Sequence, residues 1–377
     1  MPDWQDAPWP PGPDVAALGR LYLRPCDLLA GASARAAIAA GAAFPLAGGP
    51  MAFRCCELVV RGEGGRPTRR WRAPLAEIEA WAHECGGQVA DRIAGLAANV
   101  TATRPAFAGF PLDPPHLFGV LNVTPDSFSD GGEHADPDAA IAWGRLLGEG
   151  GAAIVDVGGE STRPGAHAVA VEEECRRVLP VVRDLAARGA VVSLDSRHAD
   201  VMARALDAGA CVLNDVTALT HEAASLPLAS RHHAKVVLMH MQGTPQTMQN
   251  APIYDDVVLD VFDYLEGRVA ACEDAGMPRG DLCVDPGIGF GKTLAHNLAL
   301  LETLSLFHGL GTAILVGVSR KSFLAGGRSD MLPRARLAAS IAAGLAALNQ
   351  GVQFLRVHDV PVTRQAIDVW LSLRSGR

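Results

Sequence analysis

The sequence lacks an excess of positive charge: 33 Lys and Arg stand against 41 Asp and Glu, which gives a net charge of −8 over 377 residues. Surfaces that bind nucleic acid or an anionic membrane are basic, so we expect neither partner. No uninterrupted apolar run is long enough to cross a bilayer. The acidic, proline-rich start, MPDWQDAPWPPGPD, does not resemble a secretory signal. These absences predict a cytoplasmic protein.

The sequence also lacks any C-x-x-C pair. Its eight cysteines are scattered at positions 26, 55, 56, 85, 175, 211, 272 and 283, several of them inside apolar runs. Such scatter is typical of buried thiols in a reducing compartment, and not of a disulfide framework or a zinc site.

The chain has two parts of different texture, residues 1–115 and 116–377. The first part contains a candidate strand at 51–61, a candidate helix at 74–98 and a linker with prolines at 105, 111, 114 and 115. Proline interrupts regular structure, so the linker marks a boundary. No chemical motif occurs in this part. We interpret it as a small α/β extension that serves for packing or oligomer contacts.

The second part has a regular rhythm of short apolar runs and helical stretches. The candidate strands are 117–123, 153–157, 191–194, 211–214, 235–240, 282–285, 314–318 and 353–357, and candidate helices between them include 171–188, 199–208, 257–275 and 334–349. Such alternation predicts parallel strands joined by crossover helices. Eight units in about 260 residues favour a closed (β/α)8 barrel, which typically has ~250. A doubly wound open sheet is the alternative fold.

Polar residues stand at the carboxyl end of nearly every predicted strand, where the active sites of such barrels lie. They are Asn122, Asp156, Asp195, Asn214, His240, Asp285, Ser319 and Arg356. Each also has an ordinary structural interpretation. The pair 195–196 could cap the next helix, the pair 214–215 could form a turn, and His240 is more typical of a hydrogen-bonded structural histidine. Their coincidence on one face of the barrel favours a site.

Two further features bear on an anionic ligand. Arg356 and His358 are two residues apart on a strand, so their side chains point the same way and could meet a phosphate. Lys292 follows a glycine-rich run, but the P-loop pattern would require glycine where Pro286 stands. The glycines at 287, 289 and 291 do not fit the dinucleotide pattern either.

Five segments carry a family resemblance: LNVTPDSFSDGG at 121–132, GGESTRPGA at 158–166, LMHMQGTPQTMQ at 238–249, DPGIGFGK at 285–292 and GVSRKSFL at 317–324. Together they resemble the dihydropteroate synthases, in order and through essentially all of 116–377. The resemblance implies a TIM barrel that joins a pterin pyrophosphate to p-aminobenzoate, with Mg²⁺ as cofactor and a homodimer as the assembly. It implies nothing about residues 1–115.

The resemblance also assigns roles to residues of this chain. The pterin pyrophosphate would be bound by Asn122, Thr162, Asp195, Asn214, Asp285, Lys321, Arg356 and His358, with Mg²⁺ bridging its oxygens to Asn122. The p-aminobenzoate would lie against Phe128, Thr162, Arg163, Pro164, Phe290 and Ser322, its carboxylate at the Ser322 hydroxyl and the start of the helix expected there. The residues assigned to catalysis are Asp130, Lys321 and Arg356.

Two other functions fit the same resemblance. A pterin-dependent methyltransferase would share the barrel and the pterin pocket, but it would not require the first two loops or the Ser-Arg-Lys-Ser run at 319–322. A non-catalytic pterin-binding paralogue should have lost some of the residues assigned above, and none is lost. The one departure from the usual family pattern is Ser196, where threonine is common.

Overall fold

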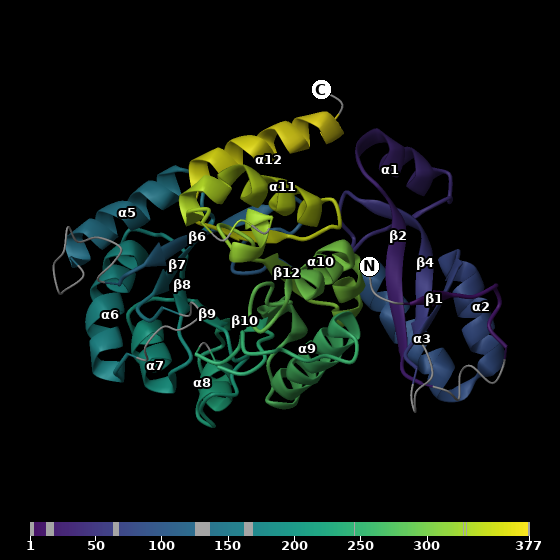
Figure 1. Cartoon of the computed structure of the whole chain (residues 1–377), viewed down its shortest axis with the longest axis horizontal. Helices are drawn as coiled ribbons and strands as arrows, with labels where there is room; N and C mark the ends of the chain where they lie inside the picture. The colour runs from purple at the N-terminus through teal and green to yellow at the C-terminus, as the bar shows by residue number, and fades with distance from the viewer. Residues whose placement is uncertain are drawn as a thin grey trace.

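The structure is a computed structural model of the chain (Figure 1), which describes residues 4–12, 19–62, 68–124, 136–161, 169–244, 246–326, 328 and 330–375. Its larger part is a closed barrel of eight parallel strands in sequential order. The strands are β6 His116–Asn122, β7 Ile154–Gly158, β8 Val192–Asp195, β9 Val212–Asp215, β10 Lys235–Met239, β11 Leu282–Asp285, β12 Ala313–Val316 and β13 Phe354–Val357. The predicted barrel is confirmed, and the open sheet is excluded because β13 pairs with β6.

Helices surround the barrel, as the rhythm of the sequence predicted. They are α5 Pro137–Glu149, α6 Val171–Ala187, α7 Ala199–Asp207, α8 Ser225–Arg231, α9 Val257–Asp274, α10 Leu294–Glu302, α11 Leu337–Leu348 and α12 Val360–Ser375. Local sequence sets several of their starts. Asp136 accepts from the Asp138 amide at the start of α5, and Asp256 accepts from the amides of Val258 and Leu259 at the start of α9.

The extension is a five-stranded sheet with three helices. Its elements are β1 Gln5–Asp6, β2 Leu21–Leu29, α1 Gly31–Ala39, β3 Phe44–Pro45, β4 Ala52–Val60, β5 Arg69–Ala73, α2 Leu75–Cys85 and α3 Gly87–Thr101. The α/β character is as predicted, but the single helix expected at 74–98 is wrong. Gly86 and Gly87 have φ angles of 67° and 52°, a left-handed backbone that glycine tolerates and that breaks the helix in two.

The extension packs along one side of the barrel (Figure 1) and shares its hydrophobic core. The ring of Tyr22 meets that of Phe262 on α9 at 5.4 Å between centroids, and the Tyr22 hydroxyl donates to Asp263 at 2.8 Å. Arg61 forms ion pairs with Asp260 and Asp263 of the same helix, at 2.5 and 3.2 Å. The interpretation of this part as a packing element is therefore supported.

The linker after α3 closes the amino-terminal end of the barrel. Phe107 is fully buried, and its ring meets that of Phe354 on β13 at 5.5 Å in an edge-to-face arrangement. Around it lies an apolar cluster to which seven of the eight strands contribute Phe118, Ile154, Val212, Val237, Cys283, Leu315 and Phe354. The eighth strand, β8, contributes the buried Ser193, which pairs in register with Val212. The buried carboxylates of the strands lie towards the opposite end.

All eight cysteines are free, but they are not uniformly buried as predicted. Cys211 is exposed, and Cys26, Cys55 and Cys85 are half-buried. The sulfurs of Cys26 and Cys55 face each other across β2 and β4 at 3.3 Å. Within the described part of the chain, no helix is long and apolar enough to cross a membrane.

Candidate active site

Six polar side chains meet at the carboxyl ends of the barrel strands. Asp156 lies on β7, Asp195 on β8, Asn214 on β9, Asp285 on β11 and Arg356 on β13, and Lys321 follows β12. We call these six residues the rim cluster. Four of them, Asp156, Asp195, Asn214 and Asp285, are between 0 and 7% exposed. Such buried polar groups must find partners in one another or in a ligand.

Arg356 is the centre of the rim cluster. Its Nε donates to Oδ2 of Asp156 and its Nη2 donates to Oδ2 of Asp195, both at 2.6 Å. Burial acts to lower the pKa of Arg356, but the two carboxylates outweigh it and hold that pKa above its usual value. Burial raises the pKa of Asp195, and the charge of Arg356 opposes the rise. The Nη1 atom takes part in neither bond.

Asp156 was not among the residues assigned to the site, although its place at a strand end was noted. Its Oδ2 accepts from Asn214 Nδ2 at 3.0 Å as well as from Arg356. Its Oδ1 is buried with no hydrogen-bond partner among the described residues. An unpaired buried carboxylate oxygen is costly, so a donor on a ligand would suit it. Its signal in the sequence was an aspartate at the end of an otherwise apolar strand.

Asp285 and Lys321 form a second pair of opposite charges. Oδ1 of Asp285 accepts from the backbone amide of Gly287 at 2.7 Å, and burial raises the pKa of this carboxyl while Lys321 opposes the rise. Burial lowers the pKa of Lys321 to about 8, and the charge of Asp285 opposes that fall. Nζ of Lys321 donates to the carbonyl of Ile288 and lies 4.6 Å from the ring centroid of Phe290. The pair thus borders a flat aromatic surface.

The buried side chain of Lys292 stabilises the loop that carries Asp285 and Phe290. This side chain is 3% exposed, and its Nζ contacts Nδ1 of His240 at 2.9 Å and the carbonyls of Gly287 and Phe290 at 2.9 and 3.0 Å. Burial lowers the pKa of Lys292 well below its ordinary value. His240 is therefore a hydrogen-bonded structural residue, as interpreted, and Lys292 is a support of the loop and no phosphate ligand.

The remaining described site residues lie around the same rim. Asn122 ends β6, beside β13, and is half-buried. Nδ1 of His358 lies 3.0 Å from the Ser319 hydroxyl. Ser322 is exposed, but the helix expected to begin there is only a four-residue 3-10 turn, Ser322–Ala325. The helix is therefore shorter than expected, and the place of the p-aminobenzoate carboxylate at Ser322 stays a prediction.

Five residues assigned to the first two loops cannot be placed in this way. Phe128, Asp130, Thr162, Arg163 and Pro164 lie outside the described residues. Their assigned roles stay predictions.

The donor set at the rim fits a hard cation only in part. Asn122 offers one amide oxygen, whereas the carboxylates of Asp156 and Asp195 are engaged by Arg356. Mg²⁺ commonly takes only one or two protein ligands and completes its shell with water and substrate phosphates. These residues therefore suit a magnesium ion that arrives with a pyrophosphate, and they do not form a cage for a resident metal.

Comparison with known proteins gives the family. Residues 118–358 match the model of the pterin binding enzyme family. The dihydropteroate synthase of Escherichia coli (strain K12) is 47% identical over 259 residues, which are 68% of this chain and 91% of that protein. A structure of the Xanthomonas albilineans dihydropteroate synthase with 4-aminobenzoic acid is 46% identical, with a TM-score of 0.66 over 70% of this chain and 94% of that one.

The same Xanthomonas albilineans enzyme in complex with 7,8-dihydropteroate superimposes with a TM-score of 0.65 at 43% identity, covering 72% of this chain and 99% of that one. The whole extension, residues 1–115, precedes the region that the family model matches. With a closed barrel, a polar rim and these likenesses, the chain belongs to the dihydropteroate synthase family of pterin-binding enzymes.

Proposed function

We propose that the rim cluster joins 6-hydroxymethyl-7,8-dihydropterin pyrophosphate to p-aminobenzoate, giving 7,8-dihydropteroate and pyrophosphate. The observation that carries the proposal is the convergence of Asp285, Asn214, Lys321 and Arg356 on one end of a barrel whose other end is filled by an apolar cluster. A buried carboxylate, an amide and two cations are what a pterin ring with an attached pyrophosphate requires.

The pterin ring would be held between two buried carboxylates, Asp285 on β11 and Asp156 on β7, which lie on opposite sides of the barrel. Its aminopyrimidine edge carries adjacent N–H donors, which Asp285 can accept in a two-pronged way. Lys321 can donate to the acceptors of the ring, and Asn214 can donate or accept. The unpartnered Oδ1 of Asp156 supplies one more acceptor at this place. Asp195 would form a further side of the pterin site, where its carboxylate accepts a hydrogen bond from Arg356.

The pyrophosphate would lie between the ends of β6 and β13. Asn122 and His358 stand at these two strand ends, and Arg356 offers its charge and its remaining Nη1. A Mg²⁺ ion held between Asn122 and the phosphate oxygens would supply charge neutralisation of the leaving group. The cationic side chains of the protein would also stabilise the leaving group, because they already lie where its negative charge develops.

The reaction is a substitution at the methylene carbon of the pterin. The carbon–oxygen bond breaks with its electron pair leaving on pyrophosphate, and the aromatic amine forms the new carbon–nitrogen bond and releases a proton. The conjugated ring can share positive charge from that carbon, so a dissociative transition state suits this chemistry. Lys321 and Phe290 border the place where the amine would arrive, with Ser322 close by in the chain. The roles of Asp130 and of the other loop residues complete the proposal.

One measurement tests the function directly. The full chain with pterin pyrophosphate and Mg²⁺ should release pyrophosphate only when p-aminobenzoate is added, in equal amount to the dihydropteroate formed. Release at the same rate without p-aminobenzoate would indicate a hydrolase. No release with either would favour the non-catalytic paralogue, and methyl transfer to or from a folate would favour the methyltransferase.

Two properties of the whole protein belong to the same proposal. We propose a homodimer and a cytoplasmic location, in keeping with the family resemblance and the acidic net charge of −8. Sedimentation velocity of the full chain at several concentrations tests the first. Fractionation of cells that express the untagged protein tests the second.

A further inference from the structure

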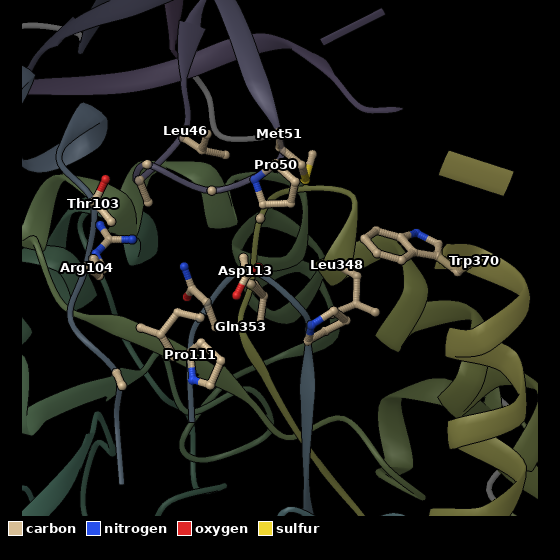
Figure 2. Close-up of a pocket in the computed structure, with 18 residues that line it drawn as sticks. Leu46, Pro50, Met51, Thr103, Arg104, Pro111, Asp113, Leu348, Gln353 and Trp370 are labelled. Carbon is tan, nitrogen blue, oxygen red and sulfur yellow. The ribbon is translucent and has the colours of Figure 1, made fainter. Parts of the chain in front are cut away.

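A cavity of about 330 Å³ lies between the extension and the amino-terminal end of the barrel. Its walls come from three segments: residues 46–51 before β4, the linker from Thr103 to Pro115, and the barrel residues Leu348, Gly351–Gln353 and Trp370 (Figure 2). The rim cluster stands at the opposite ends of the strands. This cavity is therefore separate from the candidate active site.

Arg104, on the wall of the cavity, is a buried cation without a counter-charge. It is 8% exposed, and within the described part of the chain it forms no ion pair with a carboxylate. Its Nη atoms contact His308 Nδ1 and the carbonyls of His308 and Asn99, while Nε has no hydrogen-bond partner among the residues that the structure describes. Burial lowers the pKa of Arg104 to about 10, which still leaves it charged at neutral pH.

The neighbour of Arg104 does not neutralise this charge. His308 accepts from Arg104 through Nδ1 and contacts the carbonyl of Gln350 through Nε2 at 2.9 Å. Burial, together with the charge of Arg104, lowers the pKa of His308 to about 3, so the ring is neutral. An unpaired buried charge is costly, so an anion that pairs with Arg104 would stabilise the folded chain.

The other residues that line the cavity indicate which kind of ligand it would bind. Oε1 of Gln353 accepts from the Ile314 amide at 2.9 Å, which fixes the side chain so that its Nε2 donors are free for the cavity. Leu46, Met51 and Trp370 form apolar walls (Figure 2), and the one acidic residue of the lining, Asp113, is exposed to solvent. One buried cation, one amide donor and a large apolar remainder do not suit a bare inorganic ion.

We propose that this cavity is a binding site for a small organic carboxylate with an apolar body, held by Arg104 and Gln353. Ligand sites range from about 300 to 1,000 Å³, so the cavity admits a single ring or a short aliphatic chain. Its walls belong to both the extension and the barrel. A bound carboxylate would thus join the two parts and stabilise the folded chain by mass action.

The test uses cyclohexanecarboxylate, which is not planar as p-aminobenzoate is, and its neutral amide as the matched control. The full chain is labelled with ¹³C in the methionine methyl groups, and the Met51 signal is identified by its loss in Met51→Leu. Cyclohexanecarboxylate should shift the Met51 signal with saturation and raise the melting temperature. The neutral amide should do so at least about tenfold more weakly.

Three variants separate the site from general effects. Arg104→Met should weaken binding at least about tenfold. Because this change could also loosen the linker, Gln353→Glu serves as a second variant: it keeps the bond to Ile314 but places a negative charge in the cavity, and should abolish binding. Arg35→Met, an exposed arginine of α1, should bind as the parent does.

An unchanged affinity in both Arg104→Met and Gln353→Glu would overturn the proposal, as would equal binding of acid and amide. A saturable shift of Met51 by inorganic phosphate alone, without one by cyclohexanecarboxylate, would also overturn it. Since Met51 lines the cavity and is not part of the rim cluster, these outcomes do not depend on whether the proposed synthase reaction occurs.

Discussion

Asp156 and Arg356 form a buried ion pair at the rim of the barrel: Nε of Arg356 donates to Oδ2 of Asp156 at 2.6 Å, and Asp156 has no exposed surface. The pair joins β7 to β13, two strands that are separated by β6 in the barrel. It fixes the guanidinium in one orientation, with Asp195 as its second partner. Asp156 therefore positions Arg356, in addition to the acceptor that its Oδ1 would offer to the pterin.

Replacing Asp156 with Asn should lower kcat/KM for the pterin pyrophosphate about 100-fold, because Arg356 loses its fixed orientation where charge develops. The free energy of unfolding should fall by about 3–5 kcal/mol, since one charge of a buried pair is removed. Steady-state kinetics and urea unfolding measure the two effects. Asp368→Asn is the control, because the Asp368 side chain pairs with Arg364 but is 63% exposed. This substitution should change the free energy of unfolding by less than about 1 kcal/mol. Equal behaviour of the two variants would refute the positioning role.

Replacing Asp285 with Asn should weaken the binding of the dihydropterin ring at least about 100-fold, because an acceptor becomes a donor that faces ligand donors. Titration calorimetry with the pterin alone measures this loss. Asp281→Asn is a matched control. Asp281 directly precedes the amino-terminal end of β11, away from the rim cluster, and pairs with Lys235 at 2.5 Å. Near-normal pterin affinity in Asp285→Asn would show that the ring binds elsewhere.

The activity should depend on pH through Lys321. Burial lowers the pKa of this lysine to about 8, so it is protonated below that pH and loses its charge as the pH rises above it. A neutral Lys321 is a weaker donor to the pterin, and kcat/KM should therefore fall tenfold per unit above pH ~8. Lys321→Arg should move this alkaline limb above pH ~10, because guanidinium stays charged. An unmoved limb in that variant would assign the titration to another group.

The same shift has a consequence for stability. The pKa of Lys321 is lower in the folded chain than in the unfolded one, so between the two values the unfolded chain binds more protons. The free energy of unfolding should gain a positive contribution as the pH rises from about 8 towards 10. Comparing urea unfolding of the parent and Lys321→Met across this window isolates the contribution, which the methionine variant should lack.

Lys292→Met should raise KM for both substrates more than it lowers kcat. Lys292 touches the loop that carries Asp285 and Phe290 through the carbonyls of Gly287 and Phe290, but it is assigned no contact with either substrate. Loss of these bonds would let the loop relax, so binding suffers first. Initial-rate kinetics with each substrate varied in turn separate the two parameters. A fall in kcat at constant KM would instead indicate a direct part in the chemistry.

Phe107→Ala should lower the free energy of unfolding by about 3–5 kcal/mol, as is usual for a large side chain removed from a core. The ring is fully buried against Phe354 at the amino-terminal end of the barrel. Activity per folded molecule should stay near that of the parent, because the rim cluster lies at the other end. Phe44→Ala, which removes a ring that is 37% exposed, should lower the free energy of unfolding by less.

A chain that begins near Pro114 lacks Phe107, so its free energy of unfolding should also be lower.

The barrel could be predicted because its signal is local and repeated. Each strand is a short apolar run, each connection is long enough for a helix, and eight repeats leave closure as the natural arrangement. The predicted strand ends agree with the structure to within two residues. The single helix predicted at 74–98 is wrong because Gly86 and Gly87 adopt positive φ angles, which end α2 and begin α3 at this point.

The sequence alone determined the fold class, the family resemblance and the set of polar strand ends, because strand order places every carboxyl end at one rim. It could not show which of those ends would pair. Only the tertiary structure made Asp156 the partner of Arg356 and left the second oxygen of Asp156 without a partner among the described residues. Only the tertiary structure, too, brought Arg104 and Gln353 to one cavity. Such contacts join residues hundreds of positions apart, and no local pattern records them.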